Sequence, residues 1–209
     1  TRMDRDIGTM LAKLADLGLE ENTIIMFSSD NGTTYSKGVD ASYFNSVGSL
    51  RGLKGSVFEG GVKVPFIVKW PGTVKPGSTS DHVSAFWDLL PTVAEITGAE
   101  APTNSDGNSF LATLKGNSAY QTPDKPLYWE YHAFGGMQAV RMGDWKGVRL
   151  EIRRQDNAPV QLFNLTSDPN EENDVASANP DIVALIRAVM DARIPSVRED
   201  WNFVRDSNP

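Results

Sequence analysis

The fold is decided by the stretch Thr23-Ile24-Ile25-Met26-Phe27-Ser28-Ser29-Asp30-Asn31-Gly32. Its first five residues are apolar or β-branched throughout, which is typical of a strand buried on both faces. An amphipathic helical pattern precedes it from Met3 to Leu17, and Gly18 is a natural helix end. We expect the apolar stripe of this helix to lie in the core. Helix, short turn and apolar strand together predict a layered α/β domain.

Asp30 and Asn31 lie just past the end of this predicted strand. In open α/β sheets, ligands collect outside the carboxyl ends of the strands. A carboxylate and an amide oxygen suit Ca²⁺ or Mg²⁺, but calcium takes about six to eight oxygen ligands, so two residues do not complete a site. Taken alone, Asp30-Asn31-Gly32 is better explained as a turn, because all three residue types favour turns.

A glycine-rich loop follows, with the sequence Leu50-Arg51-Gly52-Leu53-Lys54-Gly55, and it continues to Glu59-Gly60-Gly61. Its spacing differs from the dinucleotide-binding fingerprint. Lys54 could place an ammonium group on a sulfate or phosphate, although a lone lysine is more simply a solvated surface residue. Arg51 has the same two interpretations, and we interpret Glu59 as a structural hydrogen-bond acceptor that fixes the loop.

The second half of the chain has a different pattern. The first part of the chain ends with a predicted strand over Val62–Trp70 and a predicted helix from Asp88 to Gly98. The polar stretch 117–126 then predicts a domain boundary, which gives domains 1–118 and 119–209. Beyond it, short strand candidates separated by turn-like stretches predict a small antiparallel sheet covered by a helix that starts at Asn179-Pro180. The predicted strands are Leu127–Tyr131, Gln138–Met142, Trp145–Leu150 and Val160–Asn164, with a hairpin turn at Gly143-Asp144.

The composition limits the function classes. With 209 residues, 40% of them hydrophobic, the chain can bury a substantial core. A net charge of −7 argues against a nucleic-acid surface. No run approaches the ~18 apolar residues of a membrane helix, and no signal peptide is present. Because the sequence starts without Met, directly at a helical pattern, we expect a processed product or an excised piece. The absence of cysteine excludes zinc–thiolate sites.

Six stretches of the sequence, taken together and in order, are more specific for a protein family than any one of them alone. They are Asn22 to Gly32, Leu50 to Gly72, Asp88-Leu89-Leu90-Pro91-Thr92, Trp145-Lys146, Leu162-Phe163-Asn164-Leu165 and Asp168-Pro169-Asn170-Glu171-Glu172-Asn173. This ordered set resembles the sulfatase (arylsulfatase) family of the alkaline-phosphatase-like superfamily. The resemblance implies part of an alkaline-phosphatase-like α/β sandwich domain, followed by a small α+β domain with a short antiparallel sheet and one C-terminal helix.

The resemblance also implies roles for single residues. Asp30 and Asn31 match the second pair of calcium ligands of the family, and Lys54 matches the lysine that binds the sulfate group. The implied function is hydrolysis of a sulfuric ester, with Ca²⁺, or Mg²⁺, as the metal. No role is implied for Arg51 or Glu59, nor for the two histidines, His82 and His132, which are more simply structural or surface residues.

The nucleophile of the family has no match in this chain. Family members use a formylglycine made from Cys or Ser within a Cys/Ser-x-Pro-Ser/Ala-x-Arg-like signature. The nearest similar run, Arg193-Ile194-Pro195-Ser196-Val197-Arg198, has arginine at the precursor position and lies at the wrong end. No catalytic residue is therefore assigned. We expect the chain to be the C-terminal half of a sulfatase, with the formylglycine segment before Thr1, and to be inactive alone.

Two alternative functions stay open at this point. One is a phosphodiesterase or phosphonate hydrolase of the same superfamily, and the other is a non-catalytic module that binds a glycan or a partner chain. The expected substrate is a sulfated small molecule or sulfated glycan, with no nucleic-acid or membrane partner. The resemblance implies a periplasmic or secreted protein. A truncated parallel sheet would expose its face beside Thr23–Phe27, so we also expect self-association there.

Overall fold

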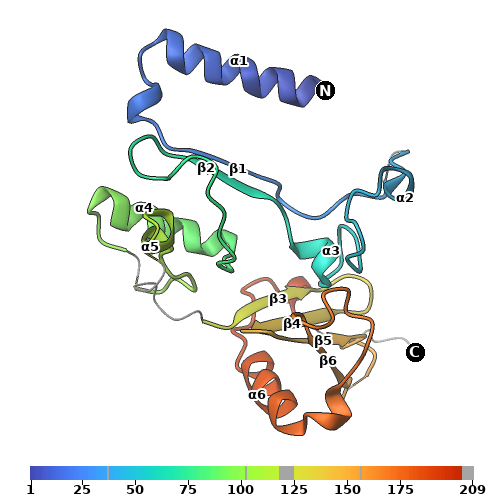
Figure 1. Ribbon diagram of the computed structural model, residues 1–209. Helices are drawn as coiled ribbons and strands as arrows, with labels where there is room; N and C mark the ends of the chain where they lie inside the picture. The colour runs from blue at the N-terminus through green and yellow to red at the C-terminus, as the bar shows by residue number, and fades with distance from the viewer. Residues whose placement is uncertain (37, 102, 118–124, 156, 204–209) are drawn as a thin grey trace. The chain divides into compact units, whose positions relative to one another are not determined.

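The computed structural model describes residues 1–36, 38–101, 103–117, 125–155 and 157–203, which form two compact units (Figure 1). The first unit combines Thr1–Ser28 with Pro65–Pro123, and the second combines Ser29–Val64 with Asp124–Pro209. The predicted domain boundary at 118/119 lies outside the described residues. Among the helices in the described residues, none is long and apolar enough to cross a membrane.

The first unit contains a two-stranded sheet and two helices that pack on each other. Strand β1 (Ile25–Ser28) pairs with β2 (Phe66–Lys69), and Ile25 lies opposite Lys69. Helix α4 (Leu89–Thr97) packs against α5 (Leu111–Leu114). The remaining elements are α1 (Arg2–Asp16), η1 (Glu20–Asn22) and η2 (Phe86–Asp88).

Two predictions for this unit are wrong. Helix α1 forms as expected but buries none of its residues, and Met10 is 65% exposed. Strand β1 is only half-buried, and among the described residues its one neighbour, β2, runs antiparallel to it. Sequence periodicity identifies the face of an element that is suited to burial, but it does not show which partner covers that face.

The second unit is built on a four-stranded antiparallel sheet of order β3-β4-β5-β6, which confirms the predicted sheet. A tight turn at Gly143-Asp144 joins the two central strands, as predicted. Besides the sheet, the unit contains the single-turn helices α2 (Ala41–Phe44) and α3 (Glu59–Val62) and the short η4 (Ala176–Ala178) and η5 (Glu199–Trp201). The strands are β3 (Leu127–Tyr131), β4 (Met137–Met142), β5 (Trp145–Leu150) and β6 (Val160–Asn164).

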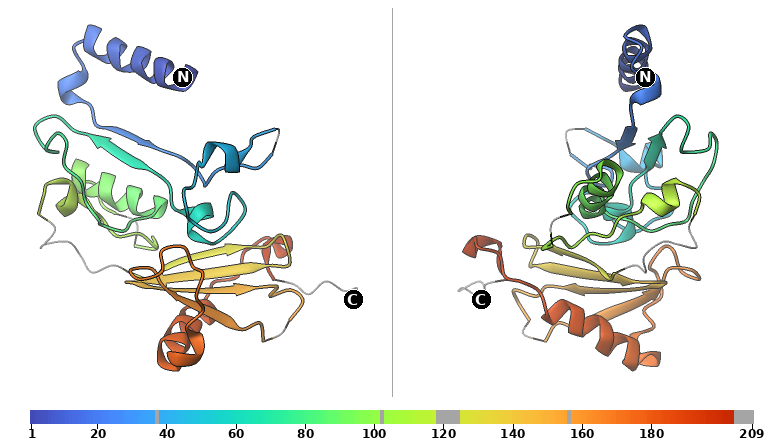
Figure 2. Two further views of the ribbon diagram at one scale, coloured as in Figure 1. Left: turned by 45° about the vertical axis from the view of Figure 1, so that its right-hand side comes forward. Right: turned by 90° about the vertical axis from the view of Figure 1, so that its left-hand side faces the viewer.

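The two faces of this sheet have different coverings, and Figures 1 and 2 show α3 and α6 on opposite sides of it. Helix α6 (Pro180–Asp191) covers one face, where Ile186 and Met190 are fully buried against Val140 and Leu162. This confirms the predicted helical cover. The other face packs against the segment that leads into α3, in a core of Val57, Phe58, Met137, Ala139, Val148 and Phe163.

Gly147 of β5 tests the packing between the sheet and α6. An added Cβ would lie 2.5 Å from Ile186 Cγ2 and 3.1 Å from Val160 Cγ1. We expect Gly147→Ala to lower the free energy of unfolding by about 1–3 kcal/mol through overpacking. The control is Gly8→Ala in α1, where no atom lies within 4 Å of the added Cβ. Urea denaturation should show Gly8→Ala neutral or slightly stabilising; equal effects would contradict this packing.

Candidate functional site

The backbone of the second unit brings the proposed metal and sulfate residues onto adjoining loops. The loop that follows β1 carries Asp30 and Asn31, and two backbone hydrogen bonds hold this loop against the glycine-rich loop. The Lys54 amide donates to the Thr33 carbonyl and the Gly32 amide donates to the Gly61 carbonyl, both at 2.9 Å. Lys54 is therefore itself the donor in one of these bonds, and Asn31 directly precedes Gly32, the donor in the other.

The glycines of these loops allow an approach that no side chain would permit. A Cβ on Gly32 would lie 1.9 Å from the Gly60 carbonyl oxygen, and one on Gly61 would lie 2.1 Å from the Ser56 carbonyl oxygen. Gly52 and Gly55 have φ of +84° and +83°, in the left-handed region that glycine adopts readily. The run of glycines is thus explained by close backbone packing, which fixes the loop that carries Lys54.

The three candidate side chains have groups available for a ligand. The Asp30 carboxylate and the Lys54 ammonium are exposed, and neither makes a hydrogen bond or ion pair within the described residues. The amide nitrogen of half-buried Asn31 donates to the Gly32 carbonyl, which leaves its Oδ1 available as an acceptor. Two adjacent oxygen donors fit part of a calcium shell. No cluster of three or more metal-ligating His, Asp or Glu residues occurs within the described part of the chain.

A buried group of charges holds the Lys54 loop on the sheet. Lys146 of β5 is fully buried, and its ammonium lies 2.8 Å from Glu59 Oε1 and 3.0 Å from Glu171 Oε1. Glu59 is the first residue of α3, and its amide donates to Glu171 Oε2 at 2.6 Å. Arg141 of β4 adds a longer contact to Glu59, at 3.8 Å. These bonds join the glycine-rich loop, the sheet and the loop after β6, and they confirm Glu59 as a structural acceptor.

Arg51 completes this attachment. Its guanidinium lies over the Phe58 ring, 3.9 Å from the centroid, and donates to the Glu171 carbonyl at 2.8 Å. Glu171 itself has a φ of +57°, an unfavourable conformation for a residue with a Cβ, which the surrounding bonds hold in place. Burial raises the pKa of the Glu171 carboxyl above its usual value, although the charge of Lys146 opposes this shift. One N–H of Arg51 and one face of its guanidinium are therefore engaged by the protein, although the residue is exposed.

The two histidines lie in different surroundings. The His82 ring packs beside Phe110 in the first unit, with centroids 6.3 Å apart. The His132 ring in the second unit stacks on Trp201, with the planes 11° apart. Each histidine makes an aromatic contact, in keeping with the structural interpretation. Arg193, which stands at the precursor position of the signature-like run, forms an ion pair with Glu130 at 2.5 Å.

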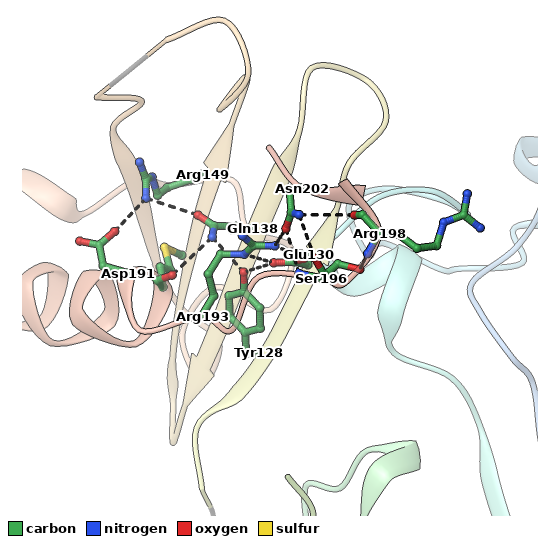
Figure 3. Close-up of polar contacts among 10 residues, drawn as sticks. Tyr128, Glu130, Gln138, Arg149, Asp191, Arg193, Ser196, Arg198 and Asn202 are labelled. Atoms are coloured by element: carbon green, nitrogen blue, oxygen red, sulfur yellow. Dashed lines mark hydrogen bonds and ion pairs between the residues drawn. The ribbon is translucent and has the colours of Figure 1, made fainter. Parts of the chain in front are cut away.

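A second polar network, which the sequence did not indicate, attaches the C-terminal segment to the sheet (Figure 3). The Arg193 guanidinium donates two hydrogen bonds to Glu130 of β3, at 2.5 and 2.6 Å, and Tyr128 donates a third at 2.5 Å. Arg193 also donates to Asn202, whose side chain accepts from the Ser196 amide at 2.9 Å. The sequence did not indicate this pair, because Arg193 follows the end of α6 and Glu130 lies 63 residues away.

This network shifts the ionisation of its members. Burial of the Glu130 carboxylate opposes its charge, but the hydrogen bonds from Arg193 and Tyr128 outweigh this, so the pKa of Glu130 lies below its ordinary value. Burial, followed by the bond to Glu130, raises the pKa of Tyr128 well above its ordinary value. Glu130 is therefore the acidic anchor of the C-terminal segment.

Two family models and several known proteins match this chain. The family model described as "Sulfatase" matches residues 1–99, and that described as "N-sulphoglucosamine sulphohydrolase, C-terminal" matches residues 53–200. Arylsulfatase A of Homo sapiens is 31% identical over 92% of this chain and 43% of its own length. The ulvan-active sulfatase of Formosa agariphila is 38% identical over 81% of this chain and 36% of its own length.

A solved structure gives the same result. The crystal structure of Ps i-CgsB in complex with k-i-k-neocarrahexaose is similar, with a TM-score of 0.75 and 30% identity over 98% of this chain and 43% of that chain. This likeness confirms the predicted fold class. The chain thus spans about two fifths of the length of the proteins it matches.

Removing the buried ammonium tests the charge group. We expect Lys146→Met to lower the free energy of unfolding by about 3–5 kcal/mol, because it leaves two buried carboxylates facing each other. The loss should shrink as the pH falls toward 5, since burial already favours the protonated form of Glu171. Urea denaturation at several pH values measures both effects.

The matched control is Lys69→Met, which breaks the ion pair with Glu20, where the two side chains are 48% and 38% exposed. A surface pair of this kind contributes less than about 1 kcal/mol, so this variant should stay near wild type. Equal losses for Lys69→Met and Lys146→Met would show that burial of the charge group has no special role.

The lowered pKa of Glu130 gives a pH dependence of defined sign. A carboxyl whose folded pKa lies below its unfolded value, about 4.3 for glutamate, stabilises the fold above that value and loses this contribution as the pH falls through the folded pKa. We expect Glu130→Gln to be less stable than wild type at pH 7, and the two free energies of unfolding to converge below about pH 4. A difference that stays constant from about pH 7 to pH 3 would contradict the network.

Proposed function

Because this chain belongs to the sulfatase family, we propose that it supplies metal-binding and sulfate-binding residues to an enzyme that hydrolyses a sulfuric ester. The observation that carries the proposal is the backbone bond from the Lys54 amide to the Thr33 carbonyl, at 2.9 Å. This bond joins the loop that carries Lys54 to the loop that carries Asp30 and Asn31.

In the proposed site, the Asp30 carboxylate and Asn31 Oδ1 would hold a calcium ion, with Mg²⁺ as the alternative. When bound, this ion would supply positive charge for the sulfate group. Lys54 places its ammonium on the same sulfate group, so that cationic charge meets the oxygens as negative charge builds up on them in the transition state. The Lys146 group keeps the Lys54 loop in register with the Thr33 loop.

The attacking group is assigned to residues outside this chain. As the family resemblance implies, a formylglycine in a segment outside residues 1–209 would supply the nucleophile, and no residue between Thr1 and Pro209 is proposed for that role. Arg193, at the precursor position of the signature-like run, is held by Glu130 instead. We therefore propose that residues 1–209 alone are inactive.

The proposed substrate class is a sulfated carbohydrate, with a sulfated small molecule as the alternative. The likeness to a structure solved with a neocarrahexaose and to an ulvan-active sulfatase supports this class. We place the enzyme in the periplasm or outside the cell, as the family resemblance implies. A phosphodiesterase or phosphonate hydrolase stays the second candidate chemistry, because a metal and a lysine would neutralise phosphoryl oxygens equally well.

The test uses the complete protein that contains this chain. We expect Lys54→Ala to lower kcat/KM for sulfate-ester hydrolysis by at least about 100-fold, or about 2.7 kcal/mol of transition-state stabilisation. Asp30→Ala and Asn31→Ala should instead weaken calcium binding, measured by calorimetry. Lys75→Ala, at another exposed lysine, is the control and should leave both readouts unchanged. A wild-type protein that hydrolyses phosphodiesters but no sulfate ester would overturn the proposal in favour of the second candidate.

A further inference from the structure

Four rings form a chain of contacts in the second unit, and two of them, Tyr131 and Phe134, lie beside Gly55 of the glycine-rich loop. They form an aromatic surface of Tyr131, His132, Phe134 and Trp201. The Tyr131 and Phe134 centroids are 6.0 Å apart, and the His132 ring stacks on Trp201 at 6.1 Å. Phe134 is 62% exposed and Trp201 is 48% exposed, so the surface presents ring area to solvent.

This aromatic surface adjoins Gly55, the residue that follows Lys54. A Cβ on Gly55 would lie 3.4 Å from Phe134 Cε2 and 3.7 Å from Tyr131 Cε1. Gly55 follows Lys54 directly, so the backbone that carries the ammonium contacts the edge of the aromatic surface. A ligand whose anionic group reaches Lys54 would bring its neighbouring atoms against these rings.

The backbone at Phe134 is held in a conformation that exposes its ring. Phe134 has a φ of +51°, which is an outlier for a bulky residue, and Gly135 and Gly136 follow with φ of +82°. A Cβ on Gly135 would lie 2.3 Å from Glu151 Oε2, and one on Gly136 would lie 2.9 Å from Phe203 Cδ1. The packing around the two glycines therefore fixes the turn, and the turn directs an apolar ring into solvent at an energetic cost.

The C-terminal segment supplies the other exposed ring. The Arg193–Glu130 pair holds this segment on β3, and η5 then places Trp201 on His132. The Arg198 guanidinium lies 4.9 Å from the centroid of the Trp201 ring and pairs with Asp200 at 2.8 Å. Exposed rings next to the loop that carries Lys54 complement a molecule that combines apolar C–H faces with negative charge, whereas the charge of Arg198 is offset by Asp200.

We propose that the aromatic surface is a subsite that binds the sugar ring of a sulfated carbohydrate while Lys54 binds its sulfate. The inference rests on the proposed function and makes it more specific, because it assigns the carbohydrate part of the substrate to Phe134 and Trp201. The C–H face of a pyranose ring packs on an aromatic side chain and removes apolar area from water. Phe134 and Trp201 therefore determine which sulfate esters bind well, without contacting the sulfur.

The experiment compares two kinds of ligand on the complete protein. Phe134→Asn and Trp201→Ala remove one ring each, and asparagine tolerates the left-handed conformation that position 134 requires. The substrates are sulfated oligosaccharides prepared from carrageenan, ulvan, chondroitin sulfate and heparin, and the second probe is inorganic sulfate as a competitive inhibitor. Phe86→Ala is the control, because Phe86 is 49% exposed and belongs to the first unit.

For whichever oligosaccharide the wild type hydrolyses, we expect each variant to raise KM by at least about 10-fold, which corresponds to about 1.4 kcal/mol. The kcat and the inhibition constant of inorganic sulfate should stay unchanged, as should all values for Phe86→Ala. Unchanged KM values in both ring variants would overturn the inference and leave the proposed function intact. Equal losses of affinity for the oligosaccharide and for inorganic sulfate would also overturn the inference, because they would show that the rings act only in packing the protein. A wild type that hydrolyses no sulfate ester would overturn the proposed function together with this inference.

Discussion

The second unit depends on one buried ammonium group. Lys146 is fully buried in the middle of the sheet, and it is retained there because Glu59 and Glu171 approach it from two separate loops. A buried charge without partners is strongly unfavourable, so moving either carboxylate away from Lys146 would destabilise the unit. The charge group therefore links the sheet to the glycine-rich loop and fixes where Lys54 can lie.

The four-stranded sheet has a separate role on each face. One face buries Ile186 and Met190 of α6, which gives the unit an apolar core. The other face carries Lys146 and packs on Phe58, next to the loop that holds Lys54. The Glu130–Arg193 pair then secures the C-terminal segment, whose Trp201 stacks on His132. A small antiparallel sheet thus presents a cationic loop and an aromatic surface side by side.

Much of the fold could be predicted from the sequence, but the extent of burial could not. Short strand-like segments bounded by turn residues located β3, β5 and β6 to the residue. The same kind of reasoning placed the apolar stripe of α1 in a core, yet Met10 is exposed, because a stripe does not name its partner. The sulfate-binding role proposed for Lys54 comes only from the ordered family pattern. Lys146 gives no local sign of burial in the sequence, because its partners Glu59 and Glu171 lie 87 and 25 residues away.

The central claim is that Asp30, Asn31 and Lys54 form one site for a metal-held sulfate. The most direct measurement is a crystal structure of the complete protein grown with calcium and sulfate. The account predicts a calcium ion bound by the Asp30 carboxylate and Asn31 Oδ1, with the Lys54 ammonium within hydrogen-bonding distance of a sulfate oxygen beside that ion. Calcium and sulfate bound elsewhere, with Lys54 directed into solvent, would contradict it.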